Sequence, residues 1–241
     1  MKKTETEWTG EIMLGVGWAL LDAQVGDNRP HRHVAHQVSL ALAGTVSVIG
    51  TATMDLAEGA AVLVPAGFEH SLQPSGAALR SLYVDPTFRG VRDLDRLTGL
   101  MTLTAVESNS LAAIRSSQDA QLWIETFLRK GAVTRIDHRL GPILDNLDPG
   151  TSPAELARIL GISTTRLREI SIRDFGVPTT KLLQWLQVQK AIEAFDLSHN
   201  LAEAAAAGGF SDQAHFTRRL VEWFGVTPSR GLARLKITTF R

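Results

Sequence analysis

Short apolar stretches separated by turn residues fill the first third of the chain, and apolar positions with helical spacing fill most of the rest. Gly, Pro or Asn interrupts the stretches between residues 12 and 84, which include VSLALAGTVSVIG, AAVLVPAGFEH and LRSLYVDP. Regularly spaced short strands are typical of a sandwich or a barrel. Beyond about residue 93, capping residues and three- to four-residue spacing predict helices. We therefore expect a β domain over 1–90, a helical connector over 91–134 and a helical domain over 135–241.

The connector is predicted to contain a helix that Ser117 caps and Gly131 ends. Its apolar stripe over Gln121–Leu128 is short. This stripe fits two alternatives, an interface between two copies of the chain and packing against its own domain.

The segment PAELARILGISTTRLREI has the pattern of a helix-turn-helix. Pro153 suits the first turn of a helix after Ser152 as its cap, and Gly161 permits the positive φ of a turn. Ser163 then caps a second helix, and Ala157 allows the two helices to cross closely. Any helical hairpin with a glycine turn would share this pattern, so it is weak evidence by itself.

The same pattern recurs 48 residues later, where Ser211 takes the place of Ser163. The intervening segment PTTKLLQWLQVQKAIEAFDL predicts a helix of about 19 residues, or about 28 Å. Two recognition helices joined by such a rod would be separated by roughly one turn of DNA, about 34 Å. The pair of motifs therefore favours DNA binding more strongly than either motif alone.

The stretch GGFSDQAHFTRRLVEWFGVTPSRGLARLK resembles the C-terminal signature of the AraC/XylS family of transcriptional regulators, and the resemblance covers about residues 150–236. It implies two helix-turn-helix subdomains joined by a central helix, binding to an asymmetric half-site in double-stranded DNA, and a homodimer. Three positions depart from the family pattern, with Glu169 and Ser171 after the motif leucine and Gln187 in the central helix. The matching residues are Gly209, Phe210, Ser211, Asp212, His215, Phe216, Arg218, Gly225, Pro228 and Ser229.

Side chains at the start of the second helix of each motif are the candidates for contacts with DNA. Arg can bridge O6 and N7 of guanine, and Gln can pair with N6 and N7 of adenine. The alternative is that these polar groups only solvate a helix face. The candidates are Thr164, Thr165, Arg166 and Arg168 in the first motif, with Gln213, His215 and Arg218 for bases and Ser211 and Arg219 for phosphates in the second.

The β domain carries a histidine pattern of its own. Its two motifs, G-x4-H-x-H-x3-Q-x6-G from Gly26 and G-x5-P-x-G-x2-H from Gly59, resemble those of the cupin superfamily. The resemblance implies a double-stranded β-helix, or jelly-roll, barrel. The usual glutamate of the first motif is Gln37 here, and Pro74 replaces the usual asparagine after the second.

His31 and His33 are two residues apart, so in a strand both point to one side, and the Pro-Gly turn brings His70 towards them. Three imidazoles and the amide oxygen of Gln37 are a suitable donor set for Zn, Ni, Fe or Cu. The alternative is that these histidines make only structural hydrogen bonds. The predicted metal ligands are His31, His33, Gln37 and His70.

Composition narrows the class of protein. Of the 241 residues, 44% are hydrophobic and 21% charged, which excludes a disordered chain. The absence of cysteine excludes disulfides, thiolate zinc sites and a cysteine nucleophile. Without a signal peptide or an apolar run of roughly 18–20 residues, the expected location is the cytoplasm, not a membrane.

The net charge of zero hides an uneven distribution. Residues 1–100 hold 8 Lys and Arg against 11 Asp and Glu, whereas residues 135–241 hold 14 against 11. The basic part is the one with the helix-turn-helix patterns, as expected if only that part meets a polyanion.

These observations favour a sequence-specific DNA-binding regulator, activator or repressor, that responds to a small molecule or divalent metal in the β domain, and not an enzyme. The alternative from another class is a metal-dependent cupin enzyme of the dioxygenase or isomerase type, for which the barrel offers Glu69 beside His70. A third possibility is a regulator whose barrel only dimerises.

Overall fold

The structure, a computed structural model, describes residues 7–74, 76–88, 94, 97–128, 137, 139–144 and 146–240. The chain forms two compact units. One comprises Met1–Lys130 together with Thr217–Arg241, and the other comprises Gly131–Phe216. This division differs from the predicted boundaries of 1–90, 91–134 and 135–241, since both the connector helices and the last 25 residues, Thr217–Arg241, join the sheet-rich unit.

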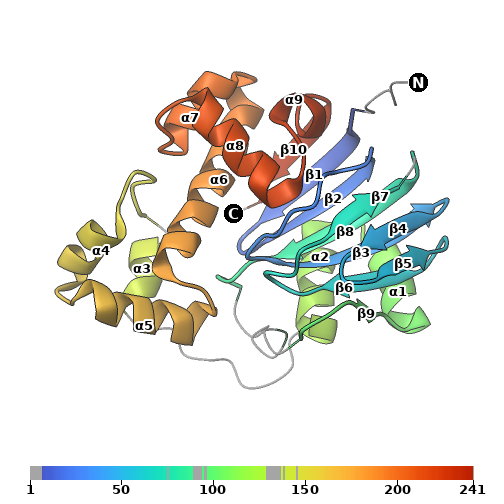
Figure 1. Cartoon of the computed structure of the whole chain (residues 1–241), viewed down its shortest axis with the longest axis horizontal. Helices are drawn as coiled ribbons and strands as arrows, with labels where there is room; N and C mark the ends of the chain where they lie inside the picture. Colours follow the sequence, from blue (N-terminus) through green and yellow to red (C-terminus); the bar gives the residue numbers. More distant parts are fainter. Residues whose placement is uncertain are drawn as a thin grey trace. The chain divides into compact units, whose positions relative to one another are not determined.

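Two sheets build the first unit (Figure 1). The larger has seven strands in the order β10-β1-β2-β8-β3-β6-β9, and the smaller has the order β5-β4-β7. The predicted strand-rich N-terminal domain is therefore confirmed, and two sheets are consistent with a cupin barrel. The strands are β1 (Thr9–Gly15), β2 (Trp18–Gln24), β3 (His36–Ala43), β4 (Val46–Ile49), β5 (Thr53–Leu56), β6 (Ala61–Val64), β7 (Ser71–Gln73), β8 (Ala78–Val84), β9 (Met101–Thr102) and β10 (Leu235–Thr239).

The two faces of the large sheet have different chemistry. In β3, Val38 and Leu40 face an apolar core, and the alternate residues Gln37 and Ser39 form a polar network on the opposite face. In β8, Leu82 and Val84 lie in the same core. This alternation follows from the two-residue period of a strand. The sequence thus places an apolar layer on one face and a polar, histidine-bearing site on the other.

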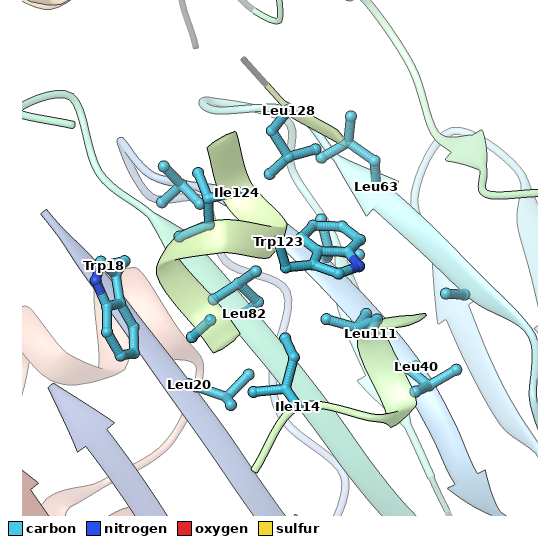
Figure 2. Close-up of a cluster of buried hydrophobic side chains, with 14 of the residues drawn as sticks. Trp18, Leu20, Leu40, Leu63, Leu82, Leu111, Ile114, Trp123, Ile124 and Leu128 are labelled. Carbon is cyan, nitrogen blue, oxygen red and sulfur yellow. The ribbon is translucent and has the colours of Figure 1, made fainter. Parts of the chain in front are cut away.

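Helices α1 (Ala105–Ala112) and α2 (Ser117–Trp123) cover the apolar face, and α2 continues into the π-helical turn η2 (Ile124–Leu128). Figure 2 shows Leu111, Trp123 and Ile124 against the leucines of the sheet. Ser116, not Ser117, caps α2. The connector stripe thus packs on its own unit, which was one of the two alternatives, although Leu122 stays 64% exposed. The predicted stop at Gly131 lies outside the described residues.

A buried arginine fastens the end of α1 to the sheet. The Arg80 guanidinium donates to the carbonyl oxygens of Leu111, Ala112 and Ile114 at 2.7–3.1 Å. It also makes a bidentate ion pair with Asp22 on the neighbouring strand β2. One buried side chain therefore adds donors to carbonyls at the helix end, where hydrogen bonding within the helix is incomplete.

The first helix-turn-helix forms as predicted. Ser152 and Ser163 cap α4 and α5, and Gly161 adopts φ 65° between them. Leu156, Leu167 and other apolar residues of these helices form one core with α6. The helices of this half of the chain are α3 (Leu140–Leu144), α4 (Pro153–Leu160), α5 (Thr164–Phe175), α6 (Thr179–Ser198), α7 (Leu201–Ala207), α8 (Gln213–Phe224) and α9 (Pro228–Gly231).

The second helix-turn-helix comprises α7 and α8, with a turn that tolerates no side chain. Gly209 has φ 73°, and a Cβ there would lie 2.7 Å from the backbone of Pro149 and Gly150. Gln187, at the place of the family's usual arginine, donates to the Pro149 carbonyl at 2.7 Å. The long helix α6 therefore holds the segment that supports this turn.

The region predicted as all-α also contains one strand. Strand β10 pairs in parallel with β1, from Gly10 opposite Leu235 to Leu14 opposite Thr239. The end of the chain is thus an edge strand of the large sheet.

Candidate metal centre and nucleic-acid interface

The three predicted histidines meet inside the sheet-rich unit. His31 and His70 face each other across a β-bridge in which each backbone N–H donates to the other residue's carbonyl at 2.9 Å. His33 follows two residues after His31, and one potential ligand atom from each imidazole lies within 4.8 Å of the others. All three side chains are buried, at 4% exposure or less. The structure therefore brings together the histidines that spacing alone predicted.

Backbone carbonyls determine which ring nitrogen carries the proton. Nδ1 of His31 lies 2.8 Å from Arg29 O, Nδ1 of His33 lies 2.8 Å from Ala35 O, and Nδ1 of His70 lies 3.0 Å from Phe68 O. A carbonyl oxygen only accepts, so each Nδ1 must donate its proton. In a neutral ring the Nε2 lone pair is then left free, which is the tautomer that metal-binding histidines usually have.

Burial keeps these rings neutral. It lowers the pKa of His31 to about 3, with a further contribution from the neighbouring His70. Burial, followed by the charges of His70 and His31, lowers the pKa of His33 well below its usual range, and burial also lowers the pKa of His70. Neutral imidazole is the form that coordinates a metal, so protons do not compete for these ligands at neutral pH.

Gln37 provides the fourth donor. Its Oε1 lies 3.0 Å from Nε2 of His33 and 3.1 Å from Nε2 of His70. With the Nδ1 atoms of His33 and His70 protonated, their Nε2 atoms carry only lone pairs, and the amide oxygen of Gln37 also only accepts. Both contacts therefore lack a hydrogen-bond donor. Either a cation between the lone pairs or a half-turn of the amide, which would present its NH2 group instead, removes this conflict.

The distances fit a cation. Zn–N and Zn–O bonds are about 2.0–2.2 Å, so two ligands of one ion lie about 3.0 Å apart at right angles and about 3.4 Å apart at the tetrahedral angle that zinc prefers, a little more than the contacts of Gln37 with His33 and His70. The amide orientation is supported from behind, because Nε2 of Gln37 donates to Ser39 Oγ at 2.7 Å, and Ser39 Oγ lies 2.9 Å from Ser81 Oγ. The donor set of three Nε2 atoms and one amide oxygen therefore fits a divalent metal ion.

Sequence reasoning missed one wall of this site. The Phe224 ring, at the end of α8, stacks on His33 with ring centroids 6.0 Å apart and meets Tyr83 at 5.9 Å. In the sequence, Phe224 only continues the helical spacing of Phe216 and Leu220. Because 191 residues separate it from His33, no local signal could have linked the two.

The predicted DNA-binding residues lie at the starts of α5 and α8, mostly in solvent. Thr164, Thr165, Arg166 and Arg168 are exposed, although Arg166 pairs with Glu169 at 3.0 Å. On α8, Gln213 and Arg218 are exposed, as is Ser211 just before the helix. These positions are open to a duplex, and the contacts themselves stay predictions.

Two residues of the second motif are more constrained than the sequence suggested. His215 is half-buried, with Nδ1 3.2 Å from Ser211 Oγ and its ring on Phe210. The side chain of Arg219 is only 14% exposed, donates to Glu222 at 2.6 Å and lies over the Trp223 ring. A phosphate contact by Arg219 would therefore compete with these partners.

Comparisons with known proteins agree with this organisation. Residues 156–234 match a family described as a helix-turn-helix domain. They form an AraC-type domain. No curated protein sequence matches the chain.

Several solved structures resemble most of the chain, including the AraC-type domain. An apo form of ToxT from Vibrio cholerae has a TM-score of 0.58 at 11% identity, covering 88% of this chain and 96% of that one. ToxT from the same organism with a bound unsaturated fatty acid has a TM-score of 0.55 at 12% identity, covering 95% and 96%. At such low identity, the likeness shows a shared fold.

No helix among the described residues is both long and apolar enough to span a bilayer.

Proposed function

We propose that the protein is a DNA-binding transcriptional regulator whose affinity for double-stranded DNA depends on a divalent metal held by His31, His33, His70 and Gln37. One observation carries the proposal. Three buried imidazoles have Nδ1 fixed on carbonyls and lie close enough for one ring nitrogen of each to be within 4.8 Å of the others, in a chain with an AraC-type domain. A bound Zn, Ni, Fe or Cu ion would supply a fixed positive charge that holds the four ligands in one arrangement.

The test combines metal analysis with DNA binding. Elemental analysis of the purified full chain is expected to give about one equivalent of a first-row metal after exposure to Zn, Ni, Fe and Cu salts. Affinity for a duplex selected by the full chain from a random pool is expected to differ between metal-loaded and chelator-treated protein. Protein that stays metal-free with all four metals would mean that the histidines are structural.

An enzymatic role has less support. The candidate acid–base group, Glu69, is exposed, whereas the adjacent His70 is buried with the other two histidines. An apolar ring, that of Phe224, stacks on His33 at this site. A general acid or base must reach the reacting group by hydrogen bonding, and Glu69 does not belong to the buried histidine cluster. Turnover by the metal-loaded full chain would contradict this assignment.

An organic effector is the second candidate, favoured by a separate pocket of about 620 Å³ in the sheet-rich unit. Polar side chains of Gln24, Thr45, Ser47 and Gln73 line it, together with small residues. The ToxT structure with a fatty acid shows that this fold can hold an organic ligand. A change in thermal stability on adding candidate ligands to metal-free protein would identify this mode.

We include a homodimer and a cytoplasmic location in the proposal. The dimer is supported by the family resemblance and by two exposed apolar side chains of the connector helices, Val106 at 70% and Leu122 at 64%. Sedimentation of the wild type and of Leu122→Glu tests it, since a charge in an apolar interface should shift the protein towards monomer.

The two adjacent arginines of α8 provide a matched test of DNA recognition. Arg218→Ala, like Gln213→Ala, is expected to weaken binding to the selected duplex by about 1–3 kcal/mol, with less effect on random DNA, because a base contact is lost. Arg219→Ala is expected to weaken both duplexes alike and to reduce the salt slope by about one, as for a phosphate contact. Equal losses for both arginine variants on both duplexes would contradict the distinction between base and phosphate contacts.

A further inference from the structure

The end of α8 is hydrogen-bonded to the loop that carries two of the histidines. The last carbonyls of a helix lack partners within the helix. Here the Arg29 N–H donates to Gly225 O at 3.0 Å, and Nδ2 of Asn28 donates to Phe224 O at 3.3 Å. Asn28 itself is fixed on β7, because its Oδ1 accepts from the Leu72 N–H at 2.6 Å. The loop between β2 and β3 therefore caps the helix.

One residue connects the helix end to a metal-site imidazole. Arg29 donates its N–H to Gly225, and its carbonyl accepts the Nδ1 proton of His31 at 2.8 Å. A shift of His31 that rotates the Arg29 carbonyl also displaces the adjoining peptide group, which contains the Arg29 N–H. The position of Gly225 and the orientation of the His31 ring are thus linked through the backbone of Arg29.

The contact leaves no room for adjustment at Gly225. Its φ is +69°, and a Cβ there would lie 2.3 Å from Arg29 O and 3.0 Å from Nδ1 of His31. The preceding residue, Phe224, packs its ring on those of His33 and Tyr83. The helix end and the histidine site therefore share a packed surface, and packed surfaces transmit strain because they have few voids.

The segment after α8 is fastened to the same unit at several points. Trp8 N–H donates to Arg230 O at 2.9 Å, and the Arg230 side chain donates to Asp27 O at 3.3 Å. Arg234 pairs with Glu7 at 2.6 Å, and β10 extends the large sheet. The last turn of α8 is thus part of the body that contains the histidines, while its first turn carries Gln213.

We propose that Phe224 and Gly225 are positioning residues through which the occupancy of the histidine site and the DNA affinity of α8 are linked. This inference rests on the proposed function. A metal bound by the Nε2 atoms would restrain His31 and His33, and through Arg29 and the Phe224 ring it would restrain the last turn of α8. Because binding linkage is reciprocal, DNA must then change the metal affinity by the same factor that metal changes the DNA affinity.

Hydrogen exchange on the full chain tests the structural part, with Zn²⁺ and Ni²⁺ as probes. Calorimetry first shows whether each metal binds. Metal is expected to slow amide exchange over residues 217–232 about 5- to 150-fold, the usual size of allosteric coupling, and to leave α5 unchanged. If metal binds and exchange over 217–232 does not change, the linkage is wrong and the metal site stands.

Affinity ratios test the functional part. The metal dissociation constant is measured with and without the selected duplex. In the wild type, the ratio of these two constants is expected to equal the ratio of the DNA dissociation constants with and without metal. Phe224→Ala is expected to bring the ratio to about one, and Phe224→Leu, which keeps an apolar contact, to restore part of it. A ratio of one in the wild type, or an unchanged ratio in Phe224→Ala, would overturn the linkage.

A substitution tests the packing between the histidine site and α8 even if the protein binds no metal. His33→Asn removes the ring on which Phe224 stacks and keeps a donor near Ala35 O. It is expected to speed exchange over 217–225, whereas Ser81→Ala, on the far side of Gln37, is not. If no metal binds but this difference appears, the packing of α8 on the histidine site stands, and the metal proposal and its metal-dependent linkage both fail. If neither occurs, the packing argument is wrong as well.

Discussion

Replacing His33 with asparagine is expected to remove stoichiometric metal binding. The asparagine Nδ2 can take over the donation of Nδ1 to Ala35 O, so the loop keeps its hydrogen bond while the Nε2 ligand disappears. Loss of an indirect supporting partner costs about 10- to 100-fold in metal affinity, so loss of a ligand should cost more than about 100-fold. Calorimetry with Zn²⁺ and Ni²⁺ and elemental analysis measure the effect.

His36→Asn is the matched control. His36, the first residue of β3, is also buried, but its Nδ1 accepts from the Ala66 N–H at 3.1 Å, and it does not belong to the cluster. An asparagine oxygen can accept the same hydrogen bond, so metal binding should persist. Loss of metal in both variants would show that the effect comes from the fold and not from a ligand.

Gln37→Glu should have the opposite effect. The carboxylate places a negative charge at the position of Oε1, 3.0–3.1 Å from two Nε2 atoms. In a buried site this charge strengthens attraction to a divalent cation. Tighter metal binding than in the wild type is the expected calorimetric result. Weaker binding would mean that the amide faces the histidines with its NH2 group and that the site is not built for a cation.

Local rules account for much of what the sequence predicted. Ser152, Ser163 and Gly161 lie where capping and turn chemistry require them, because a cap involves only residues within three positions in the chain. The two-residue period brings His31 and His33 to one side, and a Pro-Gly turn adds His70. Each of these signals lies within a stretch short enough to be recognised without an alignment.

Contacts between distant parts of the chain could not be predicted in this way. The hydrogen bond from Asn28 to Phe224 joins residues 196 positions apart, and β10 pairs with β1 at the opposite end of the chain. Nothing in the local pattern around Leu235 distinguishes an added edge strand from the end of a helical domain. The predicted helical domain over 135–241 did not anticipate that long-range pairing places the last 25 residues, Thr217–Arg241, in the sheet-rich unit.

Replacing Arg80 with methionine is expected to lower the free energy of unfolding of the sheet-rich unit by about 3–5 kcal/mol, the usual cost of removing one partner of a buried ion pair. Arg80 is 5% exposed. Its loss leaves the Asp22 carboxylate without its bidentate partner and removes the buried donor to three carbonyls at the end of α1. Methionine keeps much of the apolar part of the arginine side chain, so the decrease in the free energy of unfolding reports mainly on the lost polar contacts. Urea unfolding followed by tryptophan fluorescence measures it, since Trp123 packs in the adjoining core.

Arg115→Met is the control, because Arg115 binds two of the same carbonyls from the solvent side. Its Nη1 donates to Ala112 O at 2.6 Å and to Ile114 O at 2.7 Å, but the side chain is exposed. Exposed polar contacts usually contribute less than about 1 kcal/mol. Equal losses for the two variants would show that hydrogen bonds to the helix end matter and burial of the ion pair does not. The double variant Arg80→Met with Asp22→Leu should recover part of the lost stability, because it removes the uncompensated buried charge.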